Sequence, residues 1–275
     1  MRQVDFGIAR IAHVMWEAEL EELAGQQRKT VHLTSHMDCE LGQWLHGEGL
    51  RELYHLSPLR QLVEVHERFH RSALHLLSIA ASATPEQLDQ GMRQVRTLSR
   101  DIVYIITEAE LDYLEHKPLE DFSTHPFKTL IHRLFNIHLH DSGDAINRRV
   151  LEVSQARLMH LRWSRQLLKA FQHWGKDAAL QSAESCFLGI WIREVGSRNR
   201  QHESLIRELE EQHQLFHQRA EETIRLLRRK NFRKSEEAYQ AVVQLGREVL
   251  YLLTRIEMAL LQSGEVAKPV NFLGH

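Results

Sequence analysis

Residues 95–110, VRTLSRDIVYIITEAE, are decisive for the fold because their apolar positions recur at spacings of three and four. Residues spaced in this way lie along one side of an α-helix, so the stretch predicts an amphipathic helix with one buried stripe. We predict that this helix begins after Thr84-Pro85-Glu86, since proline is favoured in the first turn. The predicted stripe consists of Val95, Leu98, Ile102, Ile105 and Ile106.

The same stretch returns at residues 242–257, VVQLGREVLYLLTRIE, displaced by 147 positions. Six identical pairs carry the match: Val95, Leu98, Arg100, Tyr104, Thr107 and Glu110 with Val242, Leu245, Arg247, Tyr251, Thr254 and Glu257. The displacement continues without a gap towards the N-terminus, where Arg10 matches Arg157. Two copies of such a long unit predict tandem domains and not a solenoid of short repeats.

We therefore predict an all-α fold of two tandem four-helix bundles, with copy one at residues 1–116 and copy two at 152–263. Residues 117–151 form a linker with a possible connecting helix over Phe127–Leu139, and 264–275 form a tail. The first helix of each copy should end near Gly25 or Gly175, and the second near Gly47–Gly49 or Gly196. The last helix of copy two should begin at Ser235.

The composition narrows the class of protein. Hydrophobic residues make up 43% of the chain and the net charge is −2, so no global field favours nucleic acid or an anionic membrane. No apolar run approaches the roughly 18 residues of a membrane-spanning helix. The start, MRQVDFGIAR, lacks the apolar segment of a signal peptide. With two distant cysteines and no disulfide pattern, we expect a soluble protein of the reducing cytoplasm.

A second set of residues shares the same displacement and has the chemistry of a metal site. In copy one it reads His13-x-x-Trp16, Cys39-x-Leu41-Gly42-x-Trp44, His66-x-x-x-His70. In copy two it reads His160-x-x-Trp163, Cys186-x-Leu188-Gly189-x-Trp191, His213-x-x-x-His217. These are the chain's only two cysteines, and histidine is abundant, with 19 in 275 residues.

Each copy thus offers three imidazoles and one thiolate, a donor set that suits tetrahedral zinc. Two histidines four residues apart share one face of a helix, and a soft thiolate disfavours magnesium, calcium and manganese. We predict two Zn²⁺ per chain, and no catalytic residues. The predicted ligands are His13, Cys39, His66 and His70 in copy one, and His160, Cys186, His213 and His217 in copy two.

Other interpretations apply to each residue taken alone. A histidine pair can be simple helix surface, and a free cysteine is usually a small buried hydrophobe. Repetition of the whole pattern at one offset favours the interpretation that these residues are metal ligands. By the same criterion His32 and His36 are predicted to be surface residues, because Ala179 and Ala183 replace them in copy two. Gly42 and Gly189 should let a neighbouring helix approach closely, and the tryptophans should wall the site or fill the core.

The complete pattern resembles the chemoreceptor zinc-binding (CZB) domain family, and the resemblance covers nearly all of the chain except the linker and tail. It implies a small helical bundle that binds one zinc through three histidines and one cysteine. Family members attach this unit to chemoreceptors or diguanylate cyclases and commonly pair as homodimers. This chain has two units and no recognisable output module, so we expect the two units to mimic the family dimer within one chain.

Three functions follow as hypotheses. The first is a zinc sensor that signals through zinc occupancy to a partner protein in chemotaxis or cyclic-di-GMP signalling. The second is a redox sensor in which hypochlorous acid attacks the zinc-bound cysteines. The third, a helical-bundle metalloenzyme, is disfavoured because four protein ligands leave no open position for water. Homodimerisation of the whole chain is the alternative to an internal pseudo-dimer.

Overall fold

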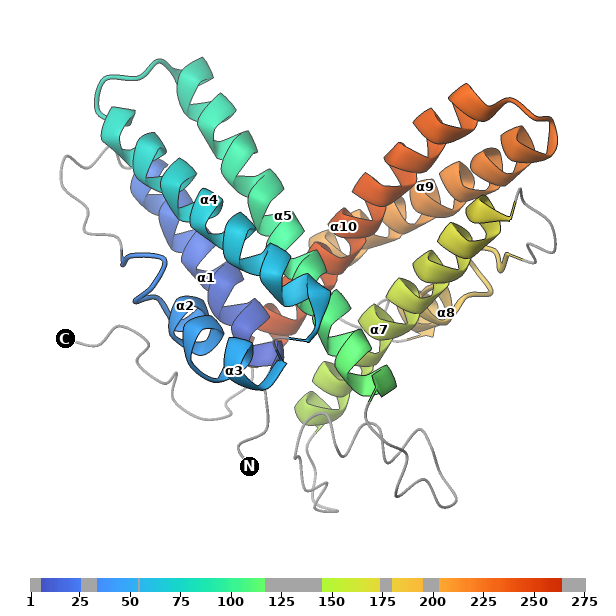
Figure 1. Cartoon of the computed structure of the whole chain (residues 1–275), viewed down its shortest axis with the longest axis horizontal. Helices are drawn as coiled ribbons and strands as arrows, with labels where there is room; N and C mark the ends of the chain where they lie inside the picture. Colours follow the sequence, from blue (N-terminus) through green and yellow to red (C-terminus); the bar gives the residue numbers. More distant parts are fainter. Residues whose placement is uncertain are drawn as a thin grey trace.

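The computed structural model describes residues 6–25, 34–53, 55–116, 145–173, 180–194 and 203–263. All secondary structure in these ranges is helical (Figure 1). The first half, up to residue 116, contains α1 (Phe6–Gly25), α2 (Glu40–Trp44), a π-helical turn (Leu45–Gly49), α3 (Leu50–Leu53), α4 (Ser57–Ile79) and α5 (Pro85–His116). The second half, from residue 145, contains α7 (Ala145–Gln172), α8 (Phe187–Glu194), α9 (Glu203–Arg228) and α10 (Phe232–Ser263).

The two halves form the arms of a V (Figure 1). In one arm α4 and α5 make a long hairpin against which α1 packs, and in the other α9 and α10 make the hairpin and α7 packs on it. The arms meet near the base, where α10 contacts both α5 and α1. No described helix is both long and apolar enough to cross a membrane.

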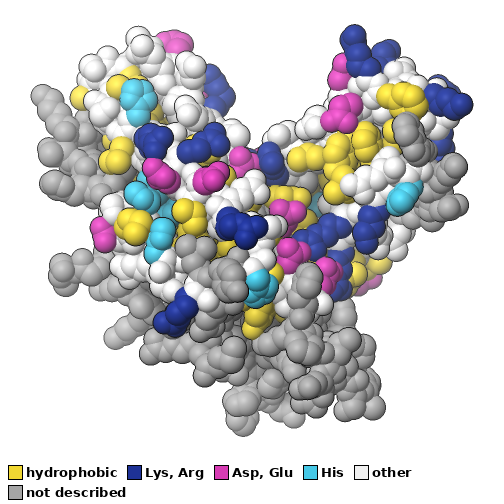
Figure 2. Space-filling model, viewed as in Figure 1, with side chains coloured by type: hydrophobic (Ala, Val, Ile, Leu, Met, Phe, Trp, Pro, Cys, Tyr) yellow, Lys and Arg dark blue, Asp and Glu magenta, His cyan; other side chains and the backbone are white. Residues whose placement is uncertain are grey.

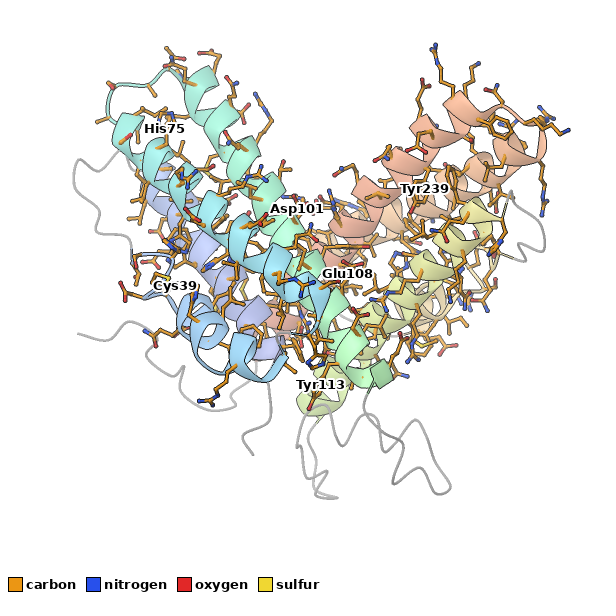
Figure 3. The ribbon with its side chains drawn as sticks, in the orientation of Figure 1. Cys39, His75, Asp101, Glu108, Tyr113 and Tyr239 are labelled. Atoms are coloured by element: carbon orange, nitrogen blue, oxygen red, sulfur yellow. The ribbon has the colours of Figure 1, made fainter. Side chains whose placement is uncertain are left out.

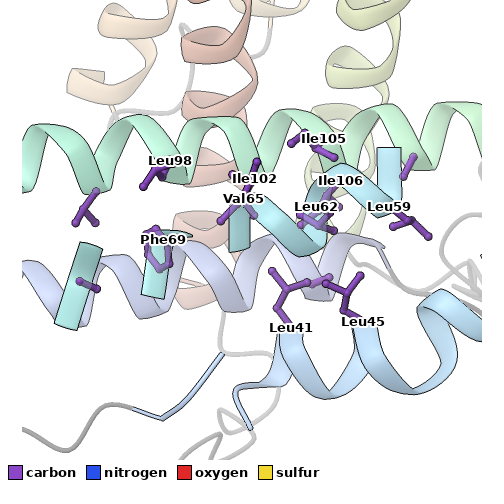
Figure 4. Close-up of a cluster of buried hydrophobic side chains, with 14 of the residues drawn as sticks. Leu41, Leu45, Leu59, Leu62, Val65, Phe69, Leu98, Ile102, Ile105 and Ile106 are labelled. Atoms are coloured by element: carbon purple, nitrogen blue, oxygen red, sulfur yellow. The ribbon is translucent and has the colours of Figure 1, made fainter. Parts of the chain in front are cut away.

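The predicted apolar stripe of α5 is confirmed as core. All five side chains are at most 4% exposed, and they face Leu59, Leu62, Val65 and Phe69 of α4 (Figure 4). Leu41 and Leu45 close this core from the segment α2 and its π-helical turn. Each fully buried aliphatic side chain contributes about 1.5–3 kcal/mol, so this packing holds α2 and α4 in fixed relation.

The predicted helix ends agree with the structure at two places. α1 ends at Gly25, and α5 begins at Pro85. At that start Gln87 N–H donates to Thr84 Oγ1 over 3.3 Å, while Thr84 N–H donates to Gln87 Oε1 over 2.9 Å. This reciprocal pair is a capping box and explains why α5 begins there. The expected ends near Gly175 and Gly196, and the linker helix at Phe127–Leu139, lie outside the described residues.

Three predicted boundaries differ from the structure. The helix carrying Cys39 does not stop at Gly47–Gly49 but widens into a π-turn and continues to Leu53. α7 begins at Ala145, within the segment assigned to the linker. α10 begins at Phe232 and not at Ser235, because the turn after α9 contains a left-handed Lys230, φ 57°, and Asn231 Oδ1 then accepts from the N–H of Lys234.

Two of the ion pairs between the halves are reciprocal, whereas those of Arg162 and Arg165 of α7 with Asp112 and Glu115 of α5 have no counterpart among the described residues. Arg100 of α5 forms an ion pair with Glu248 of α10, and Arg247 of α10 forms one with Asp101 of α5. Each arginine also lies over a tyrosine of the opposite half. Arg100 is 4.4 Å from the ring centre of Tyr251, and Arg247 is 5.6 Å from that of Tyr104. In Figure 3, Asp101 lies on the side of α5 that faces the other arm.

A buried apolar layer and two buried ion pairs complete this junction. The layer combines Val14, Val103 and Leu111 of the first half with Leu158, Leu161, Leu250 and Tyr251 of the second. Arg10 bonds to Glu110 within the first half, and Arg157 bonds to Glu257 within the second. All four side chains are at most 3% exposed. Burial lowers the pKa of Arg157, and the field of Arg10 acts on it from the other half.

Candidate metal centre

The predicted ligands of the first half come from three helices. His66 and His70 lie on the inner face of α4 and are 1% and 3% exposed, and His13 comes from α1 and is 4% exposed. Cys39 is the N-cap of α2 and lies at its start (Figure 3). Its sulfur accepts a hydrogen bond from Gly42 N–H over 3.3 Å. The cap therefore fixes the sulfur at the positive end of a helix, where a thiolate is favoured.

Three of these four residues form one cluster. Donor atoms of Cys39, His66 and His70 all lie within 4.8 Å of one another, and the Sγ of Cys39 is 3.3 Å from the Nε2 of His66. The fourth residue, His13, is turned aside: its Nε2 lies 3.1 Å from the Oγ of Ser99 on α5. The His13 ring nevertheless packs in the same pocket, 4.5 Å from the Phe69 ring centre.

The second half also brings three of its four predicted ligands together, but a different three. Donor atoms of His160, His213 and His217 lie within 4.8 Å of one another. Cys186 lies beside them, with its Sγ 3.1 Å from the Nε2 of His213 and accepting from Gly189 N–H over 3.3 Å. Each half thus gathers three histidines and one cysteine, but the three whose donor atoms lie closest together differ between the halves.

The donor atoms fit a zinc ion. The Nε2 atoms of His160 and His217 are buried, and no hydrogen-bond partner for them exists within the described parts of the chain. The Nδ1 of His217 is 3.1 Å from the backbone carbonyl of Gln181, to which it can donate. That bond fixes the tautomer in which Nε2 carries a lone pair directed at the cluster. Buried imidazole nitrogens in this state are ready to ligate a metal.

The protonation states favour metal binding by the imidazoles. Burial lowers the pKa of His66 and His213 to about 3 and that of His70 and His217 to about 4, with neighbouring imidazoles adding to the effect for His66. Burial likewise raises the pKa of both cysteine thiols, against the opposing effect of the helix-start N–H groups. The histidines are therefore neutral ligands at pH 7, whereas each cysteine must lose its proton to bind zinc.

The glycine of the Cys-x-Leu-Gly-x-Trp segment is required by a different contact from the one expected. A Cβ on Gly42 would lie 2.0 Å from the carbonyl oxygen of His36, and one on Gly189 would lie 1.7 Å from that of Ala183. The close neighbour is thus the loop that leads into the cysteine, and not another helix. The loop can turn tightly enough to cap its own helix with sulfur only because no side chain stands there.

The four motif tryptophans divide into two roles. Trp16 lies 4.7 Å from the ring of His70, and Trp163 lies 4.5 Å from the ring of His217, so these two wall the clusters. Trp44 and Trp191 serve the apolar cores of their halves, in which Trp16 and Trp163 pack as well.

Sequence reasoning did not find two neighbours of the first cluster. Ser99 has no serine counterpart at the shared offset, since Gly246 stands there. His36 was predicted to be a surface residue, yet it is half-buried and its ring centre is 6.4 Å from that of His70. Neither residue could be predicted from the repeat, because the residue 147 positions later is different in each case. Figure 2 shows histidines at the surface of the first arm.

Comparison with known proteins identifies the segment that carries the first cluster. Residues 13–77 match the family model of the chemoreceptor zinc-binding domain, and this segment contains His13, Cys39, His66 and His70. No curated protein and no solved structure matches the chain. The match is to a zinc-binding domain and is confined to residues 13–77.

Proposed function

We propose that this chain is a zinc-binding sensory protein that holds one Zn²⁺ in each half through three histidines and one cysteine. The observation that carries the proposal is the pair of buried clusters of neutral imidazoles and a helix-capping thiol. When bound, zinc would act as a Lewis acid that accepts four protein ligands, and it would thereby cross-link the helices that carry them. His13, Cys39, His66 and His70 would hold one ion, and His160, Cys186, His213 and His217 the other.

We further propose that residues 152–263 are a second domain of the same kind, and that the two domains form an intrachain pseudo-dimer. The reciprocal contacts support this. Arg247 is the counterpart of Arg100 in the other half, and Asp101 is the counterpart of Glu248. The ion pair of Arg100 with Glu248 and that of Arg247 with Asp101 are therefore the same contact made in both directions. Contacts in which i meets j and j meets i are typical of a two-fold interface between identical subunits. A homodimer of the whole chain would need another surface.

A path of hydrogen bonds supports signalling from the first cluster. His13 contacts Ser99, Ser99 donates to Glu17, and Glu17 bonds with Tyr251 of the other half. Burial raises the pKa of Glu17 to about 7. If His13 completes the ligand set through Nε2, it leaves Ser99, and filling the site would alter the bonding of Glu17 beneath the junction. Metal occupancy would in this way change how the two arms meet.

The output of this change would be read by a separate signalling protein. The resemblance to the chemoreceptor zinc-binding domain favours a partner in chemotaxis or cyclic-di-GMP signalling, in the cytoplasm. The face that binds this partner is proposed to lie on the arms whose relative position changes. No nucleic acid and no membrane insertion are part of the proposal.

A redox role is the second candidate, favoured by the half-buried thiol of Cys39. A two-electron oxidant such as hypochlorous acid would convert the thiolate to sulfenic acid, with chlorine reduced to chloride, and the site would lose its sulfur ligand. Catalysis is not proposed, because four protein ligands fill the coordination sphere.

Elemental analysis and native mass spectrometry test the proposal. Wild-type protein should carry two zinc ions per chain, and either double variant, His66→Ala/His70→Ala or His213→Ala/His217→Ala, should carry one. The untouched half is the control for folding in each case. Wild-type protein that takes up no zinc under reducing conditions would refute zinc binding, and two zinc ions in both double variants would refute the assigned sites.

A further inference from the structure

The two clusters differ in the loop that precedes the cysteine. In the first half this loop carries His36, and in the second Ala183 occupies the same place. The loops are otherwise built alike. Cys39 N–H donates to the carbonyl of Ser35 over 3.0 Å, and Cys186 N–H donates to that of Ser182 over 3.0 Å. A side chain at residue 183 would therefore start from the same backbone position as that of His36.

His36 lies within reach of the first cluster. Its ring centre is 6.4 Å from that of His70. In the second half the rings of His160 and His217 are also 6.4 Å apart, and these two belong to one set of donor atoms within 4.8 Å. A separation of this size is therefore compatible with two imidazoles sharing one ion. The buried imidazole of His70, which belongs to the first cluster, supplies the matching nitrogen donor.

The surroundings of the second cluster offer no imidazole at this place. Ala183 instead lines a pocket of about 280 Å³ that reaches His213 and also contains Glu184 and Glu210. Apart from His213, the side chains that could donate to a metal there offer oxygen atoms, from Glu184, Glu210 and Gln214. Zinc sites favour nitrogen and sulfur donors, so a neutral imidazole is the better replacement for a lost thiolate.

We propose that His36 is a reserve zinc ligand of the first site, able to replace Cys39 when the thiolate is lost, and that the second site has no such reserve. This inference rests on the proposed zinc function. With Cys39 in place, four ligands are already present and His36 stays outside. Without the thiolate, His36 joins His13, His66 and His70 as a fourth nitrogen. The first site then retains zinc, while the second depends on Cys186.

The test is a pair of double-mutant cycles on single-site proteins. The first site is measured in the His213→Ala/His217→Ala background, with Cys39→Ser, His36→Ala and both. The second is measured in the His66→Ala/His70→Ala background, with Cys186→Ser, Ala183→His and both. Zinc dissociation constants are obtained by competition with a chromophoric chelator, and helix content by circular dichroism verifies the fold of every variant.

We expect His36→Ala alone to change the zinc dissociation constant of the first site little. Once Cys39 is replaced, His36→Ala should raise that constant about tenfold or more, which corresponds to about 1.4 kcal/mol. Ala183→His should restore about tenfold in the Cys186→Ser protein. Cobalt(II) absorption gives a second readout. Cys39→Ser should remove the sulfur charge-transfer band but keep the tetrahedral bands, and adding His36→Ala should remove those as well.

The inference is overturned if His36→Ala has the same effect with and without Cys39, or if Cys39→Ser and Cys186→Ser weaken their sites equally. Glu184→Gln in the Cys186→Ser protein tests the rival carboxylate, and a tenfold loss there would also overturn the claim that only the first site has a reserve. These outcomes are distinct from failure of the zinc function itself, in which the single-site parents would bind no zinc.

Discussion

The Nε2 of His13 lies 3.1 Å from the Oγ of Ser99, and the equivalent bond cannot form in the second half because Gly246 has no side chain. Ligation of a metal through the Nε2 of His13 would break this buried bond. A buried hydrogen bond contributes about 0.5–1.5 kcal/mol net. Ser99 therefore opposes zinc binding at the first site alone.

Ser99→Ala should consequently raise the zinc affinity of the first site by up to about tenfold, and leave the second site unchanged. Chelator competition on the two single-site backgrounds measures both. A decrease in first-site affinity would instead mean that Ser99 orients the bound imidazole.

Zinc binding at pH 7 should release about one proton per site. The imidazoles are already neutral, since their pKa values lie near 3 and 4 or well below 6.5, whereas burial holds the thiols protonated. Calorimetry in buffers of different ionisation enthalpy counts the protons. Release from the first site carrying Cys39→Ser, in the His213→Ala/His217→Ala background, should fall to near zero, and unchanged release there would exclude the thiol as the source.

The metal-free protein should lose stability in mild acid. The folded pKa values of His66 and His213 are about 3, below the unfolded value of 6.5, so the folded state resists protonation that the unfolded state accepts. Stability is full above pH 6.5 and falls as pH drops towards 3, by up to about 1.4 kcal/mol per pH unit for each histidine.

Urea unfolding at pH 7.5 and 5.0, with chelator present, measures the loss. The His66→Ala/His213→Ala protein is the control and should show a smaller difference between the two pH values. An equal difference would place the acid sensitivity elsewhere.

The junction between the arms should respond to charge exchange. Arg100→Glu places like charges opposite one another at Glu248, and should open the angle between the arms. Small-angle scattering should report a larger radius of gyration, and Arg100→Glu/Glu248→Arg should return it to the wild-type value. Arg247→Glu, facing Asp101, should behave alike, because its contact is the reciprocal one. Freely moving lobes in the wild-type protein would rule out the pseudo-dimer.

Removing one member of a buried ion pair should lower the free energy of unfolding more than charge exchange at the junction does. Glu110→Gln leaves Arg10 charged and buried, and Glu257→Gln does the same to Arg157. Loss of a partner from a buried pair typically costs about 3–5 kcal/mol. Thermal and urea unfolding should show similar losses for the two variants, and a loss below 1 kcal/mol in either would mean that water reaches the arginine.

The sequence was informative where local physics or the repeat determines the structure. The stripe from Val95 to Ile106 and the start at Thr84 were predictable, because side-chain spacing and capping act within one helix. The clustering of Cys39, His66 and His70 could be anticipated because the pattern occurs twice.

What could not be predicted depends on contacts between distant elements or on differences between the copies. The bond from His13 to Ser99 joins residues 86 positions apart and has no counterpart in the repeat. The carbonyl of His36 against Gly42 depends on the path of a loop that no periodicity describes. The acidic partners at the junction, Asp101 and Glu248, share only their charge, so identity between the copies did not reveal them.

The differences at residues 36 and 183, and at 99 and 246, have a consequence for dose response. In an assembly of two identical chains, any substitution changes both sites together, and both fill at the same concentration of free metal. One continuous chain removes that constraint, so each position can be tuned by itself. If the chain holds two zinc ions as proposed, two unequal sites would give two thresholds on one concentration axis, and a single molecule would distinguish scarcity, sufficiency and excess.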